Sequence, residues 1–215
     1  QWAGGEYTAN QKFTELVEKL GCAIWASGAK NDEEAMNAMY EGETVASLIV
    51  NATATIGEKI TLRRVSAYEK NDNQVFGAYA HNGGKIVVLA ILDGDNQEVA
   101  KDVCMHVAAM SPKCISKDDV DQAFIASETE ILKAEAKNDP KNANKPDAIL
   151  EKMIAGRLQK ELKEICLLEQ PFVKNPDETV GQYVTNKKCA VKSCARIAVG
   201  EGIEKRVDDF AAEVM

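Results

Sequence analysis

Two histidines and six cysteines are the side chains of this sequence best suited to catalysis or metal binding. His106 falls in the apolar stripe of a predicted helix, and we interpret it as a packed core histidine. His81 ends a predicted strand beside an Asn-Gly-Gly turn. A contact role suits His81 better than catalysis, because it has no serine or cysteine at a recognisable nucleophile motif to work with. The histidines therefore predict no catalytic site.

The cysteine spacing predicts neither a metal site nor a disulfide scaffold. Cys189 and Cys194 are five residues apart on a predicted strand, so their side chains point to opposite faces. The sequence contains no CxxC and no HxxxH pair, and we expect no metal and no cofactor. Cys104 lies two residues before His106, and such residues do not face each other on a helix. We interpret the cysteines as reduced thiols, with a thiol-dependent α+β enzyme as an alternative function.

The segment Asn144 to Asp147 reads NKPD, which has the form of the NKxD motif that reads guanine in GTPases. That motif acts together with a phosphate loop, GxxxxGK[ST], which this sequence lacks. We interpret the segment as the start of a helix with Pro146 near its first turn. The sequence predicts no GTP binding by this route.

Charge and hydropathy exclude two further classes of function. The 34 acidic and 26 basic residues leave a net charge of −8, which argues against nucleic-acid binding. The longest apolar run, residues 86–92, is far shorter than the roughly 20 residues of a membrane span. No signal peptide is visible from Gln1 onward. We expect a cytoplasmic protein whose partner is a protein or a small molecule.

Hydrophobic periodicity predicts an α+β fold, with one or more antiparallel sheets, packed helices and a projecting antiparallel helical hairpin. The hairpin is predicted from two amphipathic patterns, 118–136 and 146–166, joined by a polar segment. The predicted strands cover 59–69, 74–81, 85–93 and 189–199. The other predicted helices cover 13–20 (ended by Gly21), 32–40, 44–56 (capped by Thr44 and Gly57), 96–110, 179–186 and 203–214.

Six ordered blocks of sequence resemble the bacterial elongation factor Ts family. The segment IGEKITLRRV at 56–65 is similar to the family's IGENIxxRR, and AHNGGKI at 80–86 follows at the family's distance. VAKDVCMHVAA at 99–109 with Pro112 is similar to a third family segment. The remaining blocks are 145–146 with 153–157, 168–174 with Thr179 and Val180, and 200–205.

The resemblance implies a guanine nucleotide exchange factor that binds elongation factor Tu, in its GDP-bound and nucleotide-free forms, and promotes GDP release. It implies no catalytic residue. The family's contact positions match Ile56, Gly57, His81, Val173 and Lys174, with Phe172 beside them. Core packing is the alternative role for Ile56, and an internal anchor is the alternative for Phe172. A structural dimerisation module without exchange activity is an alternative function.

The resemblance also suggests a division into domains. Residues 1–71 would form an incomplete N-terminal subdomain of the core, and 72–117 with 171–215 a C-terminal subdomain. Residues 118–170 would form the helical hairpin as a dimerisation module, so we expect a homodimer through this hairpin.

The family's N-terminal helical module, its β-hairpin and a TDFV segment find no match in this sequence. In the family the phenylalanine of TDFV wedges into Tu, whereas residues 6–10 here read EYTAN. The chain is therefore either a fragment or a divergent member without the wedge. We favour a fragment, because the missing hairpin would leave strand 59–69 short of partners. We expect exchange to be at least about tenfold slower than with the upstream residues restored, because contacts made equally with both nucleotide states do not shift their equilibrium.

Overall fold

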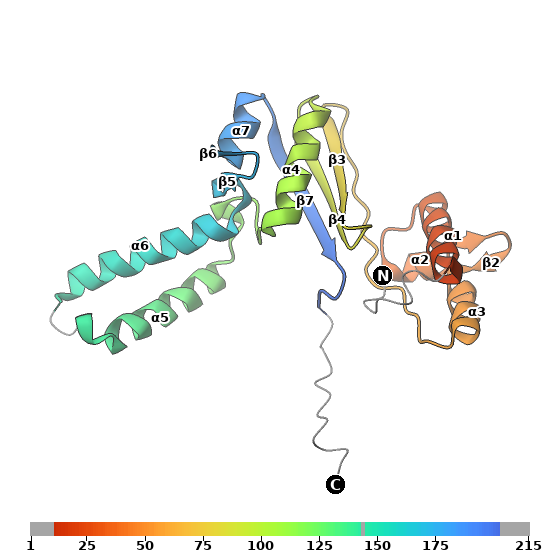
Figure 1. The fold of residues 1–215 in the computed structure, drawn as a ribbon, viewed down its shortest axis with the longest axis horizontal. Coiled ribbons are helices and arrows are strands. Elements are labelled where there is room, and N and C mark those ends of the chain that lie inside the picture. Colours follow the sequence, from red (N-terminus) through yellow and green to blue (C-terminus); the bar gives the residue numbers. More distant parts are fainter. Residues whose placement is uncertain (1–10, 143–144, 203–215) are drawn as a thin grey trace, which may run out of the picture. The chain divides into compact units, whose positions relative to one another are not determined.

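The computed structural model describes residues 11–142 and 145–202, which divide into two compact units (Figure 1). The described part of unit 1 is 11–69 with 199–202, and that of unit 2 lies within 70–198. Residues 6–10, Asn144 and the helix predicted at 203–214 lie outside the described residues.

Unit 1 contains three helices and a short hairpin within its described part. These elements are α1 (Gln11–Ser27), α2 (Asp32–Met36), β1 (Met39–Tyr40), β2 (Glu43–Thr44) and α3 (Val45–Ile56). Its core forms where one face of α1 meets α3, with Leu20 and Ala23 packed against Val45 and Ile49. As predicted, α3 is capped by the Thr44 side chain, which accepts the Ser47 N–H, and by Gly57 in the left-handed region at φ 84°.

The prediction that Gly21 ends the first helix is wrong, because α1 continues to Ser27. The apolar face continues with it, since Leu16, Leu20 and Ala23 are buried at helical spacing. Gly21 lies on an exposed part of the helix, where glycine costs about 1 kcal/mol relative to alanine. The burial of the apolar face of α1 stabilises the helix by more than this cost.

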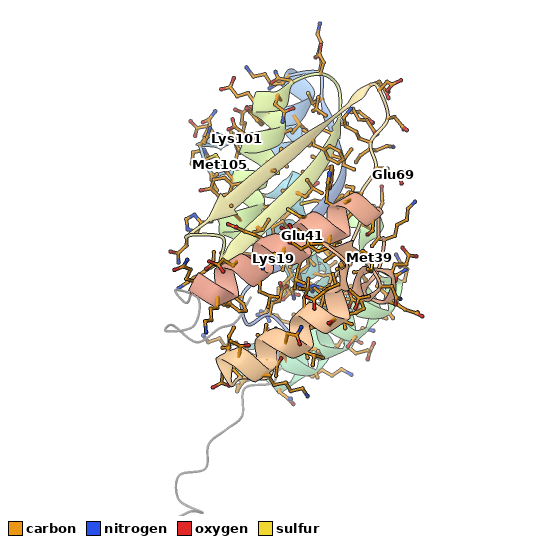
Figure 2. All side chains as sticks on the ribbon, turned by 90° about the vertical axis from the view of Figure 1, so that its right-hand side faces the viewer. Lys19, Met39, Glu41, Glu69, Lys101 and Met105 are labelled. Carbon is orange, nitrogen blue, oxygen red and sulfur yellow. The ribbon has the colours of Figure 1, made fainter. Side chains whose placement is uncertain are left out.

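The helix predicted at 32–40 is also too long, because α2 ends at Met36. Met39 pairs with Thr44 and Tyr40 with Glu43, so the chain turns back through Glu41 and Gly42. Met39 and Glu41 are labelled in Figure 2. Both turn residues have positive φ, at 49° and 92°. This backbone suits a two-residue hairpin, so the Glu-Gly pair is the turn signal that the helical interpretation missed.

The strand predicted at 59–69 is absent from the described structure, in which residues 59–71 are irregular. Its alternation does bury one side, because Ile60 and Leu62 pack against the core of unit 1. Arg64, however, has a φ of 73°, and the N–H groups of Arg64 and Val65 donate to the carboxylate of Asp32 at 3.2 and 2.5 Å. A side chain thus takes the place of a neighbouring strand. Because residues 59–69 form no strand, they do not require neighbouring strands.

Unit 2 is organised around an antiparallel sheet of three strands in the order β3-β4-β7. The strands are β3 (Gln74–His81), β4 (Ile86–Asp93) and β7 (Ala190–Ala198), close to the predicted ranges. His81 pairs with Ile86 across the Asn82-Gly83-Gly84 turn, and all three turn residues have positive φ, as predicted. The helix α4 (Gln97–Met110) packs its buried side chains against those of β4, which forms the main core of the unit.

Gly77 sets the distance between β3 and α4. A Cβ at this position would lie 2.3 Å from the carbonyl oxygen of Ala100. Only a residue without a side chain permits this approach of helix to strand.

The segment between α4 and β7 contains two long helices and a smaller β-α element. The long helices are α5 (Gln122–Asn138) and α6 (Asp147–Ile165), which lie side by side (Figure 1). Leu132, Ala136 and Ile154 are buried between them. The smaller element comprises β5 (Pro171–Phe172), β6 (Asn175–Thr179) and α7 (Val180–Asn186), and short 3₁₀ helices lie at 117–119, 140–142 and 167–169.

These elements confirm the predicted α+β class. Within 11–142 and 145–202, no helix combines the length and apolarity that crossing a membrane requires.

Candidate partner-binding site

Two polar residues on α4 are buried where the helix faces the β5–β6 turn. Asp102 and His106 are four residues apart and lie on the same face of the helix. Asp102 is 5% exposed and His106 is fully buried. Buried polar groups of this kind need hydrogen-bond partners, and both find them in residues 170–183.

His106 links the start of β5 to the turn that follows it. Its Nδ1 accepts the backbone N–H of Val173 at 3.3 Å, so its Nε2 carries the proton and donates to Oε1 of Gln170 at 2.9 Å. Nε2 of Gln170 in turn donates to the carbonyl of Glu164 at 2.6 Å. Burial lowers the pKa of His106, although the bond to Gln170 opposes this effect. The neutral ring is the form that can accept the bond from Val173.

Asp102 connects the same turn to α7, through the side chains of Lys174 and Tyr183. One carboxylate oxygen accepts from the Lys174 ammonium at 2.5 Å, and the other accepts from the Tyr183 hydroxyl at 2.8 Å. Burial, together with the bond to Asp102, raises the pKa of Tyr183. The Tyr183 ring stacks on Phe172, with the ring centroids 4.2 Å apart. Residues from α4, β5 and α7 therefore support the turn on its buried side.

The turn itself is open to solvent. Phe172 pairs with Asn175, which leaves Val173 and Lys174 as the two turn residues. Phe172 is only 2% exposed, whereas Val173 is 41% exposed. We call Val173 and Lys174 the presented turn. It offers an apolar and a cationic side chain on a backbone that a buried network holds in place.

The other predicted contact residues lie at the ends of secondary-structure elements. His81 is exposed at the end of β3, with its Nδ1 3.2 Å from the Tyr79 hydroxyl. Gly57 is exposed and closes α3 by donating its N–H to the Thr53 carbonyl at 2.9 Å. Ile56 is half-buried and lines an open groove between α1 and α3, with Lys12 and Glu15.

The predicted residues belong to both units. Ile56 and Gly57 are part of unit 1, whereas His81 and residues 172–174 are part of unit 2. Phe172 ends β5 and Val173 and Lys174 form the turn that follows it, and the structure confirms His106 as a buried histidine. Sequence reasoning did not identify Asp102, Gln170 and Tyr183. The available signal was the i, i+4 pair of polar residues on an otherwise apolar helix face.

The structure gives little support to the thiol-enzyme alternative. Cys104 is fully buried, and burial, with a smaller effect of Cys194, raises the pKa of its thiol to about 12. A thiol of this kind stays protonated near neutral pH and is a poor nucleophile. Among the residues that the structure describes, no group of three His, Cys, Asp or Glu side chains is arranged to hold a metal ion.

Comparison with known proteins defines the family. A family model described as elongation factor Ts matches residues 8–201. The elongation factor Ts of Acholeplasma laidlawii is 47% identical over 207 residues, which cover 96% of this chain and 70% of that protein. The chain therefore belongs to the elongation factor Ts family.

Proposed function

We propose that this chain is a guanine nucleotide exchange factor that binds elongation factor Tu and promotes the release of GDP. The observation that carries the proposal is the family match along residues 8–201. No bond in the nucleotide has to be made or broken, so the function requires a binding surface and no catalytic residue. We further propose that the protein works in the cytoplasm and does not act on nucleic acid.

The physical basis of exchange is the linkage between two binding equilibria. A factor that weakens GDP binding to Tu must itself be bound more weakly when GDP is present, by the same factor. Each tenfold weakening of GDP takes about 1.4 kcal/mol of contact energy made preferentially with nucleotide-free Tu.

We assign the contact with Tu to Ile56, Gly57, His81 and the presented turn. The turn is supported by its geometry, because its side chains are exposed while His106 holds its backbone at Val173 and Asp102 holds the Lys174 ammonium. A surface that is ordered before binding loses less conformational entropy on association. Phe172 contributes through the packing that positions Val173, since its own side chain is buried.

The proposal also covers the domain roles. We propose that residues 118–170 form a dimerisation module and that the chain forms a homodimer through α5 and α6. Ile131 and Ile149 on these helices are exposed in the single chain, which favours a partner there. Sedimentation that shows a monomer at tens of micromolar would remove the dimer and leave the exchange function untouched.

Release of fluorescent GDP from Tu in stopped flow tests the exchange function directly. The chain should accelerate release, and Val173→Asp should reduce its affinity for Tu at least tenfold, because a charge replaces an exposed apolar contact. His81→Ala should weaken binding more than twofold.

Val50→Asp is the matched control, because this valine is 67% exposed on α3, outside the proposed contact residues and outside α5 and α6. It should leave GDP release unchanged. An unmodified chain that does not accelerate release would overturn the proposal, and wild-type affinity in Val173→Asp would remove the turn from the contact.

A further inference from the structure

Two cysteines that are 52 residues apart in sequence meet where α5 and α6 join the rest of unit 2. Sγ of Cys114 lies 3.1 Å from Sγ of Cys166, and both residues are free thiols in the structure. They precede α5 and follow α6, respectively, so together they bracket the whole helical pair. Neither cysteine has a role in the proposed exchange function.

The backbone already holds these two residues in register. Cys114 and Cys166 are partners in a parallel bridge. The carbonyl of Cys114 accepts the Leu167 N–H at 2.9 Å, and the Lys113 N–H donates to the Ile165 carbonyl at 2.8 Å. Chains paired in this way run about 4.8 Å apart, which lies within the range of about 4.4–6.8 Å between the Cα atoms of disulfide-bonded cysteines. The sulfur atoms therefore need to approach by only about 1 Å to reach bonding distance.

The two thiols differ in their access to solvent. Cys114 is half-buried, whereas Cys166 is fully buried in a cluster with Val120 and Leu162. A reagent from solution therefore reaches Cys114 first. Burial, with a further contribution from the adjacent Cys114 sulfur, raises the pKa of Cys166 to about 12. Its thiolate fraction at neutral pH is therefore small, and its attack depends on the 3.1 Å contact with Sγ of Cys114, which Cys104 lacks.

We propose that Cys114 and Cys166 form an oxidisable pair that closes into an intramolecular disulfide by exchange with a low-molecular-weight disulfide such as glutathione disulfide. The Cys114 thiolate attacks one sulfur of the small disulfide, which forms a mixed disulfide and releases one small thiolate. Cys166 then loses its proton to solvent, and its sulfur attacks Sγ of Cys114. The Cys114–Cys166 bond forms, and a second small thiolate leaves. The protein loses two protons and two electrons, and the small disulfide takes up the electrons.

The remaining cysteines provide internal comparisons. Cys22 is exposed on α1, and no cysteine partner is found near it in the described structure, so it should form only a mixed disulfide. Cys104 and Cys189 are buried, and Cys194 is half-buried on β7, where burial raises the pKa of its thiol to about 11. All three should remain reduced. The experiment therefore uses Cys22→Ala as the background, which removes the exposed thiol without altering a buried side chain.

The test is incubation of the folded Cys22→Ala chain with glutathione disulfide, followed by acid quenching, alkylation and intact mass measurement. The product should lose the mass of two hydrogen atoms, carry no glutathione and yield a peptide cross-linked between Cys114 and Cys166. Adding Cys166→Ala should instead trap one stable glutathione on position 114. Reduction of the internal disulfide by glutathione should require at least about a hundredfold higher concentration than reduction of the mixed disulfide on Cys22 of the unaltered chain, because the two sulfurs are held together.

Two outcomes would overturn the proposal. One is a glutathione adduct that persists on Cys114 while Cys166 is intact, and the other is the absence of any change at either residue. Both outcomes are measured on the Cys22→Ala chain, in which no buried residue is altered, so neither depends on a variant with altered packing.

Discussion

Replacing Asp102 with Asn tests whether burial decides the strength of the two bonds that this carboxylate accepts. The donors are the Tyr183 hydroxyl at 2.8 Å and the Lys174 ammonium at 2.5 Å. The side chain of Asp102 is 7% exposed, whereas that of Lys174 is 46% exposed. Water competes for the exposed ammonium and screens its charge. We therefore expect the bond from Tyr183 to stabilise the fold more than the ion pair does, although the pair is shorter and carries two charges.

The contribution of each bond to the stability of unit 2 follows from how exposed its donor and acceptor are to water. A hydrogen bond to a buried charged group contributes about 1.5–3 kcal/mol, and a solvent-exposed ion pair about 0.2–1 kcal/mol. Asp102→Asn keeps the shape but removes the charge and one acceptor, so it should destabilise unit 2 by about 2–3 kcal/mol. In double-mutant cycles, the coupling of Asp102 to Tyr183, measured with Tyr183→Phe, should be about 1.5 kcal/mol. The coupling to Lys174, measured with Lys174→Met, should stay below about 1 kcal/mol.

Amide hydrogen exchange in α4 is the appropriate assay, because it reports on unit 2 alone in a chain of two units. The exchange free energy of residues 97–110 would be compared among the wild type, the three single variants and the two doubles. Lys101→Met serves as a control, since Lys101 is exposed on the same helix and should leave exchange unchanged. A coupling to Lys174 that equals or exceeds the coupling to Tyr183 would refute the reasoning that burial decides.

Three further perturbations have expected outcomes. Gly77→Ala should destabilise unit 2 by about 3 kcal/mol, because its Cβ would meet the Ala100 carbonyl, and wild-type exchange in α4 would contradict this. Below pH 6.5 the urea midpoint should fall, because the lowered pKa of folded His106 means that the unfolded state binds an extra proton, and His106→Phe should flatten this dependence. Above pH 9 the midpoint should fall again, because the unfolded thiols of Cys104 and Cys166 ionise while the folded ones, each with a pKa of about 12, stay protonated. Cys104→Ala should make this fall less steep, and an equally steep fall would show that Cys104 does not contribute to it.

The elements that local sequence determines were predicted well. The α3 helix has a side-chain cap at Thr44 and a glycine stop at Gly57, and the β3–β4 hairpin has an Asn-Gly-Gly turn. These signals act within a few residues, so a sequence pattern suffices to read them. The strand predicted at 59–69 was wrong because alternation of apolar and polar residues is compatible with any extended chain that packs on one side. The actual hydrogen-bond acceptor of this segment, Asp32, lies more than 30 residues away in sequence.

In the candidate site, too, local features could be predicted from the sequence and long-range contacts could not. His106 was correctly interpreted as a buried histidine from its helix face. Its partner Val173 lies 67 residues further along the chain, and Tyr183 lies 81 residues beyond Asp102. No local pattern encodes such pairings. The network under the turn could therefore be recognised only once the fold had placed α4, β5 and α7 together.

The bridge between Cys114 and Cys166 means that the chain leaves the sheet-bearing part of unit 2 and returns to it at a single point. The intervening segment behaves topologically as an insertion, since its two ends are already neighbours before α5 and α6 are considered. Such an arrangement permits the helical pair to vary in length without changing the register of the three-stranded sheet. A shortened pair that keeps Val120, Phe124 and Leu162, which pack at its base, would preserve both the junction and the presented turn. The segment is thus a natural position at which to graft, trim or replace a module while the rest of the unit retains its fold.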